Sequence, residues 1–470
     1  MKKYDAVIIG AGPSGQSCAV RIAELGGTVA IVERDFIGGI CTNWGCTPSK
    51  SMIESAKVAQ TVKESEKYGI TVEKYYVDFP RVAKRRNHVV ESVREEIRDL
   101  LEHYKVDIYY GQAEPNADRT VLIREGKLDP DGESMHFSGK TETITAANIV
   151  FATGSQPLDL PSFDKNDPTV VSSNRLITIE ELPASLTIIG GGVIGLEFAT
   201  IFSNLGSQVT IIEFLDRVAA GMDEEISGTI TDILEKKGVA IFVGHEALSV
   251  DHGVITMRDR KTGEEKSVSS DLVLVAIGRK PVILTESLEK LGVQYTKKGI
   301  GVDETLRTNQ KDVWAIGDAT GKSILAHVGI QQGVICGENI MANAGKLRKM
   351  DYGVIPAVIY SIPEVATVGI IPDDLSMVRV EKIPFSVNLR ANIEDYREGF
   401  VKLWMRDGKL LAVQAIGHNV SEIIQEFANM IALETPIEKV AEIIHAHPSY
   451  AEIARSAFAY TIGKAVDFYL

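Results

Sequence analysis

Residues 4–33 read YDAVIIGAGPSGQSCAVRIAELGGTVAIVE, and this stretch decides the fold. An apolar strand runs into a Gly-x-Gly-x-x-Gly turn, a helix with apolar residues every three to four positions follows, and a second apolar strand ends in glutamate. The same order returns at residues 187–213, TIIGGGVIGLEFATIFSNLGSQVTIIE. In both copies the third glycine stands 18 positions before the glutamate. We therefore expect two dinucleotide-binding βαβ units.

The glycines of each unit have separate roles. The first permits the tight turn, the second lets the backbone approach a pyrophosphate, and the third lets helix and strand pack closely. The phosphates meet the positive end of the helix. A glycine-rich turn that binds nothing is the alternative. The residues concerned are Gly10, Gly12, Pro13, Ser14, Gly15, Glu33 and Arg34 in the first unit, and Gly190, Gly192, Ile194, Gly195 and Glu213 in the second.

The terminal carboxylates indicate which nucleotide each unit takes. Glu33 can accept hydrogen bonds from both hydroxyls of a ribose. Glu213 at the same place in the second unit would repel a 2′-phosphate, so NAD is favoured over NADP. Arg217, four residues further on, could weaken this preference, and a solvated glutamate at the end of a strand is the alternative.

The composition is that of a globular protein. The chain has 470 residues, of which 44% are hydrophobic and 24% charged, and its length predicts about three domains. A net charge of −14 argues against nucleic acid and anionic membranes as partners. No apolar run approaches the ~18 residues of a membrane helix, and the apolar stretch near the N-terminus is too short for a signal peptide. We expect a cytoplasmic protein, with an organelle matrix protein whose transit peptide is absent as the alternative.

Hydrophobic patterns predict the rest of the organisation. Helical patterns lie around 48–67, 80–104, 223–238, 420–433 and 450–465, and short apolar strands lie between them. The fold class is α/β, with two Rossmann-like dinucleotide-binding domains and a C-terminal α+β domain. The expected domains are a first nucleotide-binding domain with the cysteine motif at 1–150, a second at 151–280, a central domain at 281–350 and an interface domain at 351–470.

Residues 38–50 read GGICTNWGCTPSK and carry two of the four cysteines. Cys41 and Cys46 can form a dithiol/disulfide couple, but in a regular helix the Cα atoms of positions i and i+5 are roughly 8–9 Å apart. A disulfide needs less than about 7 Å, so the turn must be distorted, which Gly45 and Pro48 would allow. A zinc site or two inert thiols are the alternatives. The remaining cysteines, Cys18 and Cys336, lie in apolar helical patterns and are expected in the core.

The two fingerprints and the Cys-x4-Cys-x-Pro-x-Lys motif together resemble the flavin- and pyridine-nucleotide-dependent disulfide oxidoreductases, over essentially the whole chain. The resemblance implies FAD on the first unit and the nicotinamide nucleotide on the second. It implies that Cys41 attacks the substrate and that Cys46 lies next to the flavin. Lys50 would lie near the flavin N5, paired with Glu197; without the resemblance, both would be ordinary helix-surface charges.

Further cofactor contacts follow from the same resemblance. Gly317 and Asp318 resemble the family's second FAD contact, with Asp318 on the ribityl chain. The other residues implied in cofactor binding, besides Cys41 and Lys50, are Gly39, Ala113, Thr153, Gly154, Gly278, Arg279, Leu325, Ala326 and His327. No metal site is expected.

The segment His-Pro-Ser-Tyr-Ala-Glu at residues 447–452 resembles the family's C-terminal His-Pro-x-x-x-Glu signature. The resemblance implies that His447 is the acid/base for the thiols and that Glu452 orients it. It also implies a homodimer in which His447 of one subunit serves the disulfide of the other. A lone histidine in the core or on the surface is the alternative.

Within the family the chain is most similar to the dihydrolipoamide dehydrogenases. It has no C-terminal cysteine pair, both redox cysteines are present, and Glu213 favours NAD. The expected activity is oxidation of dihydrolipoamide carried by a partner protein, with NAD as acceptor. The alternatives are a reductase similar to glutathione or mercuric reductase, or a flavoprotein NADH sensor or electron-transfer partner. Four residues depart from the usual pattern, near the expected substrate side: Trp44, Gln331, Gln332 and Tyr450.

Overall fold

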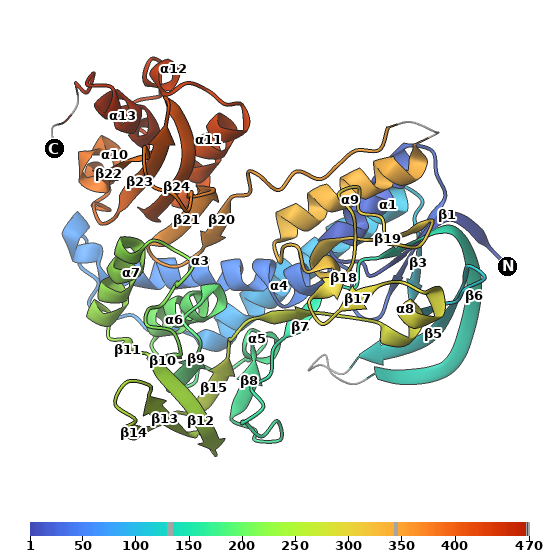
Figure 1. Cartoon of the computed structure of the whole chain (residues 1–470). Helices are drawn as coiled ribbons and strands as arrows, with labels where there is room; N and C mark the ends of the chain where they lie inside the picture. Colours follow the sequence, from blue (N-terminus) through green and yellow to red (C-terminus); the bar gives the residue numbers. More distant parts are fainter. Residues whose placement is uncertain (129–134, 343–345, 467, 469–470) are drawn as a thin grey trace.

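The structure is a computed structural model that describes residues 1–128, 135–342, 346–466 and 468. Figure 1 shows the C-terminal lobe, coloured orange to red, above the second nucleotide-binding unit in green. The first unit, in blue and teal, lies on the other side of the molecule together with the yellow segment. Among the described residues, no helix is both long and apolar enough to cross a membrane.

The first sheet joins the N-terminal unit to a strand from far along the chain. Its order is β3-β2-β1-β6-β5-β4, and β19 also pairs with β6. The parallel neighbours β1, β2 and β6 have buried apolar residues in register, because helices and loops cover both faces. The strands are β1 (Lys3–Ile9), β2 (Val29–Glu33), β3 (Asp107–Tyr110), β4 (Gln112–Pro115), β5 (Thr120–Leu128), β6 (Met135–Phe151) and β19 (Val313–Ala315).

The second unit repeats this arrangement. Its parallel sheet has the order β11-β10-β9-β15-β8, and a small antiparallel sheet, β12-β13-β14, is attached to it. The strands are β8 (Val170–Ser172), β9 (Ser185–Ile189), β10 (Gln208–Glu213), β11 (Ala240–Val243), β12 (His245–Asp251), β13 (Val254–Asp259), β14 (Glu265–Ser269) and β15 (Leu272–Val275). The helices are α5 (Ser173–Leu176), α6 (Val193–Leu205) and α7 (Glu224–Lys236).

Two helices and a central segment complete the part of the molecule that contains the nucleotide-binding units. Helix α9 (Ala326–Met341) packs on α1 (Pro13–Glu24) so closely that a Cβ added at Gly333 would lie 2.3 Å from the Ser14 carbonyl oxygen. Cys18 and Cys336 are buried where these helices meet, as expected. The smaller elements are β7 (Ser155–Pro157), β16 (Arg279–Pro281), α8 (Thr285–Leu291), β17 (Tyr295–Thr296), β18 (Gly299–Ile300) and the 3-10 turn η2 (Gly317–Thr320).

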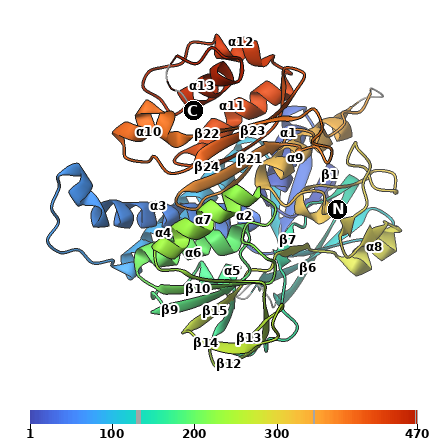
Figure 2. The same ribbon diagram turned by 60° about the vertical axis from the view of Figure 1, so that its left-hand side comes forward.

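Figure 2 shows an arm that projects from the body of the molecule. It consists of α3 (Cys46–Lys63), η1 (Ser65–Tyr68) and α4 (Phe79–His103), close to the helices predicted at 48–67 and 80–104. Helix α3 packs against α6, and its buried Met52 belongs to the same apolar core as Phe198 and Phe202. The helix that begins at Cys46 is therefore fixed between the two nucleotide-binding units.

The C-terminal lobe is an antiparallel sheet with helices on it. The strand order is β20-β21-β24-β23-β22, and α11 and α13 pack their apolar faces on a core that contains Phe427 and Phe458. The strands are β20 (Ala357–Ile359), β21 (Glu364–Gly369), β22 (Arg379–Pro384), β23 (Phe400–Arg406) and β24 (Lys409–Gly417). The helices are η3 (Phe385–Val387), α10 (Leu389–Ile393), α11 (Val420–Ala432), α12 (Ile437–Ala441) and α13 (Glu452–Thr461).

Candidate active site

The cysteine motif lies in a broken helix. Helix α2 (Gly39–Asn43) ends before Trp44, and α3 starts again at Cys46. The break is at Gly45, whose φ of −123° and ψ of −112° lie outside the helical region. An added Cβ at Gly45 would be 3.0 Å from the Ile40 carbonyl oxygen. The predicted distortion between the two cysteines is therefore present, and Pro48 lies in the first turn of α3.

The two cysteines are free thiols in this structure and are hydrogen-bonded to each other. The hydrogen bond with Cys46 and burial raise the pKa of the Cys41 thiol. The hydrogen bond from Cys41 and the nearby Lys50 ammonium lower the pKa of Cys46 to about 7, although burial opposes the shift. Because Cys46 is also the first residue of α3, the partial positive charge at this helix end favours its thiolate. Cys46 is therefore the more acidic thiol of the two and the one that forms the thiolate near neutral pH.

The expected ion pair lies beside the thiols. Lys50 Nζ is 3.0 Å from Oε1 and 2.9 Å from Oε2 of Glu197. The Glu197 carboxylate is buried, and its Oε1 also accepts a hydrogen bond of 3.0 Å from the backbone N–H of Tyr360. The Lys50 ammonium lies 4.3 Å from the centroid of the Tyr360 ring. A fixed cation is thereby placed next to the Cys46 thiolate.

The third glycine of each fingerprint packs helix against strand, as predicted. A Cβ added at Gly15 would lie 2.0 Å from the Gly10 carbonyl oxygen, and one at Gly195 would lie 2.0 Å from the Gly190 carbonyl oxygen. At Gly192, in contrast, an added Cβ would have no heavy atom within 4 Å and would project into open space. Gly192 thus leaves space for a ligand, whereas Gly15 and Gly195 allow the helix to pack closely against the preceding strand.

The terminal carboxylates bind backbone N–H groups of their own fingerprints. Glu33 accepts hydrogen bonds from Ala11 N at 2.7 Å and Asp35 N at 2.9 Å, and burial raises its pKa. Glu213 accepts hydrogen bonds from Gly191 N at 2.5 Å and Leu215 N at 2.7 Å. Each carboxylate oxygen keeps a further lone pair, and both side chains line the cavity described next. The same carboxylate can therefore tie the turn together and accept a ribose hydroxyl.

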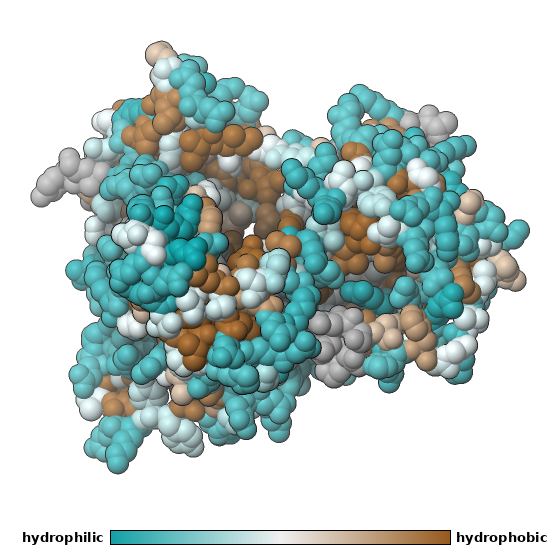
Figure 3. All heavy atoms as spheres, turned by 60° about the horizontal axis from the view of Figure 1, so that its bottom comes forward, coloured by the Kyte–Doolittle hydropathy of each residue, from teal (hydrophilic) through white to brown (hydrophobic). Residues whose placement is uncertain are grey.

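One cavity of about 1540 Å³ runs along both nucleotide-binding units. Figure 3 shows apolar residues gathered around a hollow near the middle of the molecule. All predicted cofactor-binding residues line the cavity except Gly15 and Gly195, which are the two packing glycines. Cys41, Cys46, Lys50 and Glu197 line it as well. A cavity with two glycine turns and two acidic strand ends fits two dinucleotides, and these residues would hold FAD and NAD.

A polar chain formed by one buried and two half-buried side chains lines the cavity beside the first fingerprint. Asp318 Oδ2 accepts a hydrogen bond of 2.5 Å from Ser155 Oγ, which in turn accepts one of 2.9 Å from Arg279 Nε. Burial raises the pKa of Asp318 and lowers that of Arg279. Ser155 was not predicted, although it directly follows the Thr153-Gly154 turn that was. Its hydroxyl fixes the Asp318 carboxylate in the wall of the cavity.

The predicted His447–Glu452 pair is formed in the C-terminal lobe. His447 Nδ1 is 2.8 Å from Glu452 Oε1, and Glu452 Oε2 accepts a hydrogen bond of 2.7 Å from Ser449 N. The His447 side chain is 65% exposed. Neither residue is among those that line the large cavity of the same chain. Glu452 thus fixes the orientation of the imidazole, and the pair lies outside the cavity that holds the thiols of its own chain.

The structure corrects one expectation about the unusual residues. Gln332 does not lie on a substrate-facing surface: it is fully buried, accepts a hydrogen bond of 2.6 Å from Gly317 N, and donates one of 2.9 Å to Tyr352 Oη. A side chain at this place on α9 faces the core, where only a hydrogen-bonded polar group is tolerated. Trp44 is half-buried and lines the large cavity, and Tyr450 donates a hydrogen bond of 2.9 Å to Glu394.

Arg217 does not face the second nucleotide site. Its guanidinium lies 3.2 Å from Glu224 and donates to the Ala220 carbonyl, and it does not line the cavity. Within the described ranges, no cluster of three or more His, Cys, Asp or Glu side chains could bind a metal.

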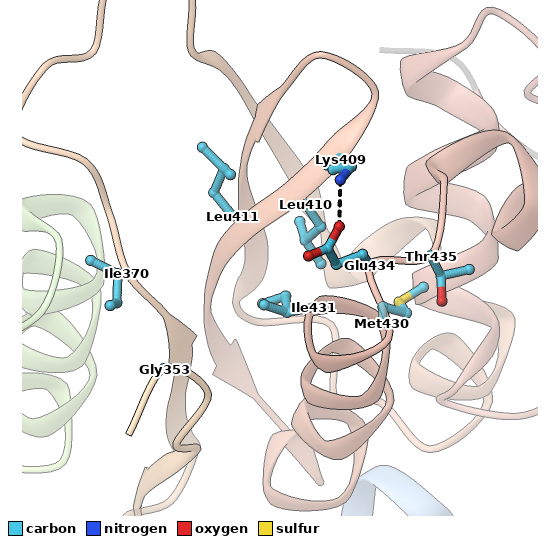
Figure 4. A pocket seen from close by; sticks show the side chains of 9 residues that line it. All are labelled: Gly353, Ile370, Lys409, Leu410, Leu411, Met430, Ile431, Glu434 and Thr435. Carbon is cyan, nitrogen blue, oxygen red and sulfur yellow. Dashed lines mark hydrogen bonds and ion pairs between the residues drawn. The ribbon is translucent and has the colours of Figure 1, made fainter. Parts of the chain in front are cut away.

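A second, smaller cavity of about 310 Å³ lies in the C-terminal lobe. Figure 4 shows Lys409 and Glu434 paired beside the apolar side chains of β24 and α11. No thiol, histidine or glycine-rich turn lines it. The redox chemistry therefore belongs to the large cavity.

Comparison with known proteins gives the same class. The family described as pyridine nucleotide-disulphide oxidoreductase matches residues 4–333, and its dimerisation domain matches residues 355–458. Dihydrolipoyl dehydrogenase of Chlamydia pneumoniae is 36% identical over 459 residues, 96% of this chain and 95% of that protein. That of Geobacillus stearothermophilus is 35% identical over 471 residues, 98% and 97% of the two chains.

A solved structure extends the comparison. The Cu(II) complex of the HOCl-induced flavoprotein disulfide reductase RclA from Escherichia coli has a TM-score of 0.86 and 26% identity. The alignment covers 98% of this chain and 100% of that one. The likeness therefore includes both nucleotide-binding units and the C-terminal lobe.

Fold and site define an FAD-dependent disulfide oxidoreductase with a nicotinamide nucleotide as the second cofactor. The chain belongs to the pyridine nucleotide-disulphide oxidoreductase family. This confirms the resemblance, the fold class and the cofactors FAD and NAD expected from the sequence. The match to the dimerisation domain supports a homodimer.

The two kinds of fingerprint glycine should respond differently to alanine. We expect Gly195→Ala to lower the melting temperature, because its Cβ would clash with a backbone oxygen and overpacking of this kind costs about 1–3 kcal/mol. Gly192→Ala should melt as the wild type does and raise the KM for NAD at least about tenfold, since the methyl group fills ligand space. Gly228→Ala, exposed on α7 with no heavy atom near its Cβ, is the control. Equal melting temperatures for Gly195→Ala and Gly192→Ala would contradict this assignment.

Proposed function

We propose that the enzyme oxidises protein-bound dihydrolipoamide with NAD, through FAD and a Cys41–Cys46 disulfide. The observation that carries the proposal is the polarised thiol pair, which lies beside the Lys50–Glu197 ion pair in the cavity shared by both nucleotide units. The relatives named dihydrolipoyl dehydrogenase cover nearly the full chain and support the choice of substrate. Glu213, with Arg217 turned away from the site, supports NAD.

The chain's own residues supply the sulfur chemistry. A substrate thiolate attacks Cys41 Sγ, which forms a mixed disulfide and releases Cys46 as the thiolate that Lys50 stabilises. The second substrate thiol loses its proton to His447 of the partner subunit, attacks the substrate sulfur of the mixed disulfide and releases Cys41. Cys41 takes up the proton that the first substrate thiol released when it became the attacking thiolate, and His447 of the partner subunit keeps the second proton. The substrate has then lost two electrons and two protons, and the enzyme holds a thiol at Cys41 and a thiolate at Cys46. The residues that line the large cavity would hold FAD and NAD, and bound FAD would supply the two-electron chemistry that links the reduced thiols to NAD.

The proposal also covers the dimer, the source of the lipoyl group, the domains and the location. The active sites are shared across a two-fold dimer, a proposal supported by the exposure of His447 and by its absence from the residues that line the cavity of its own chain. The lipoyl group comes from a partner protein. We assign an FAD domain at 1–150, an NAD domain at 151–280, a central domain at 281–350 and an interface domain at 351–470, and the cytoplasm remains the predicted location.

Nucleotide choice is a direct test of Glu213. We expect kcat/KM for NADH to be at least ten times that for NADPH, because the Glu213 carboxylate faces a 2′-phosphate and about 1.4 kcal/mol is enough for this ratio. Glu213→Gln should lower the ratio of kcat/KM for NADH to kcat/KM for NADPH, and Arg217→Ala should leave this ratio unchanged. Equal use of both nucleotides by the wild type would contradict the role of Glu213.

A substrate panel tests the proposed function. Purified, FAD-loaded enzyme is assayed with dihydrolipoamide and NAD, and in reverse with lipoamide, glutathione disulfide or mercuric ion and NADH or NADPH. We expect lipoamide and dihydrolipoamide to give the highest kcat/KM. The likeness to the flavoprotein disulfide reductase RclA supports the alternative of a different reductase. Preference for another acceptor would establish that alternative, and NADH oxidation with none of them would favour a sensor or electron-transfer partner.

A further inference from the structure

Tyr360 connects the C-terminal lobe to the ion pair beside the thiols. It directly follows β20 and lines the large cavity. Lys50 comes from α3 and Glu197 from α6, and both contact Tyr360: Glu197 through the 3.0 Å hydrogen bond from the Tyr360 backbone, Lys50 through the face of its ring at 4.3 Å. Three separate parts of the chain therefore meet at this residue.

A second contact of the same segment fixes helix α3. Lys57 Nζ is 3.2 Å from Glu364 Oε1, and the buried Glu364 also accepts a hydrogen bond of 3.0 Å from Ser421 N. Lys57 lies seven residues, or two turns, after Lys50, on the same side of the helix. The short segment 360–364 thus contacts α3 at two points, and α3 begins with Cys46.

The ring of Tyr360 limits where the Lys50 ammonium can go. Lysine has a flexible four-carbon stem, and the Lys50 side chain is 34% exposed, so Glu197 alone does not hold it in one position. An aromatic face attracts a cation within about 6 Å of its centroid. The titratable and charged groups that face Cys46 are Cys41, Lys50, Glu197, Tyr360 and Arg279. Of these, Lys50 and Arg279 are the cations, and Lys50 is the one whose ammonium lies against the Tyr360 ring.

We propose that Tyr360 is a positioning residue for the redox pair: its ring and its backbone N–H hold the Lys50–Glu197 ion pair in place beside Cys46. The inference rests on the proposed function, since it takes Cys46 to be the thiol next to the flavin. The backbone hydrogen bond to Glu197 survives any side-chain replacement, so substitutions at Tyr360 isolate the ring.

The test is a pH titration of the FAD-loaded protein. In a Cys41→Ser background, the long-wavelength absorption of the Cys46 thiolate against oxidised flavin is recorded from acid to alkaline pH. Adding Tyr360→Leu should raise the pH midpoint of this absorption by about one unit. At any pH below the midpoint, the variant then has about tenfold less Cys46 thiolate. Tyr360→Phe keeps the aromatic face and should leave the midpoint unchanged. FAD content and melting temperature verify that each variant is folded; if the leucine variant loses FAD, Tyr360→Met replaces it.

A double-variant cycle shows whether Tyr360 acts through Lys50. Lys50→Gln alone should raise the midpoint, and Tyr360→Leu added to it should raise it no further. An unshifted midpoint with leucine, equal shifts for leucine and phenylalanine, or the same leucine shift in the Lys50→Gln background would each overturn the inference. Absence of the absorption band from Cys41→Ser itself would instead overturn the proposed function.

Discussion

The Cys46→Ser variant is expected to lose turnover by roughly a thousandfold or more and to show no long-wavelength absorption after reduction. Without Cys46 no disulfide can form, and no thiolate lies against the flavin. Cys41→Ser should lose turnover to a similar extent but keep the band in the oxidised enzyme, because Cys46 then stays a thiolate that Lys50 stabilises. Steady-state assays and absorption spectra of the two variants check both statements.

The pH dependence of the band is part of the same expectation. The pKa of Cys46 is lowered to about 7 from 9.0, so the thiolate is present above this pH and the band of the reduced enzyme should fade as the pH falls through about 7. Cys336→Ala, in the buried pair on α1 and α9, is the control and should retain turnover. A band that is kept by Cys46→Ser and lost by Cys41→Ser would reverse the assigned roles.

The His447→Gln variant should lose about 10²–10⁴-fold in kcat, the usual contribution of a general acid/base. The informative experiment mixes subunits. A heterodimer of one Cys41→Ser subunit and one His447→Gln subunit contains one intact site if His447 serves the partner's thiols, and about half of wild-type activity is then expected. If each His447 served its own subunit, this heterodimer would have almost no activity.

The reciprocal heterodimer is the matched control. Here one subunit carries both substitutions and the other carries none. If His447 acts on the thiols of the partner subunit, this heterodimer has no intact site. If His447 acts on the thiols of its own subunit, one site is intact. The two heterodimers therefore give opposite results under the two arrangements, and half activity in the reciprocal heterodimer would contradict the shared site.

Local patterns predicted the nucleotide-binding units because each depends on neighbouring residues. Gly15 must be glycine since its Cβ would meet a carbonyl oxygen only five residues away in the chain. The break between α2 and α3 was predictable for a similar reason, because helix geometry and a five-residue spacing suffice to exclude a regular helix across Cys41 and Cys46. Both features therefore follow from residues that are close together in the chain.

Residues that act through distant contacts were not predicted. Tyr360 and Glu197 are separated by 163 positions, and nothing in the sequence around Tyr360 indicates that its backbone binds a carboxylate. The same holds for the Ser155–Asp318 hydrogen bond, which also spans 163 positions. Gln332 was expected near the substrate side, but it lies in the core. Polar residues on helices are usually exposed, whereas here two hydrogen bonds satisfy the buried amide of Gln332.

The central claim is that the Cys41–Cys46 pair carries the electron pair from dihydrolipoamide to NAD. The most direct test is an anaerobic titration of the oxidised, FAD-loaded enzyme with dihydrolipoamide, followed by thiol labelling and mass spectrometry. The account predicts that reduction exposes two new thiols per subunit, at Cys41 and Cys46, together with the long-wavelength band. Addition of NAD should then restore the disulfide and yield one NADH per subunit. NADH formation without any change in the labelling of Cys41 and Cys46, or no reduction by dihydrolipoamide, would contradict it.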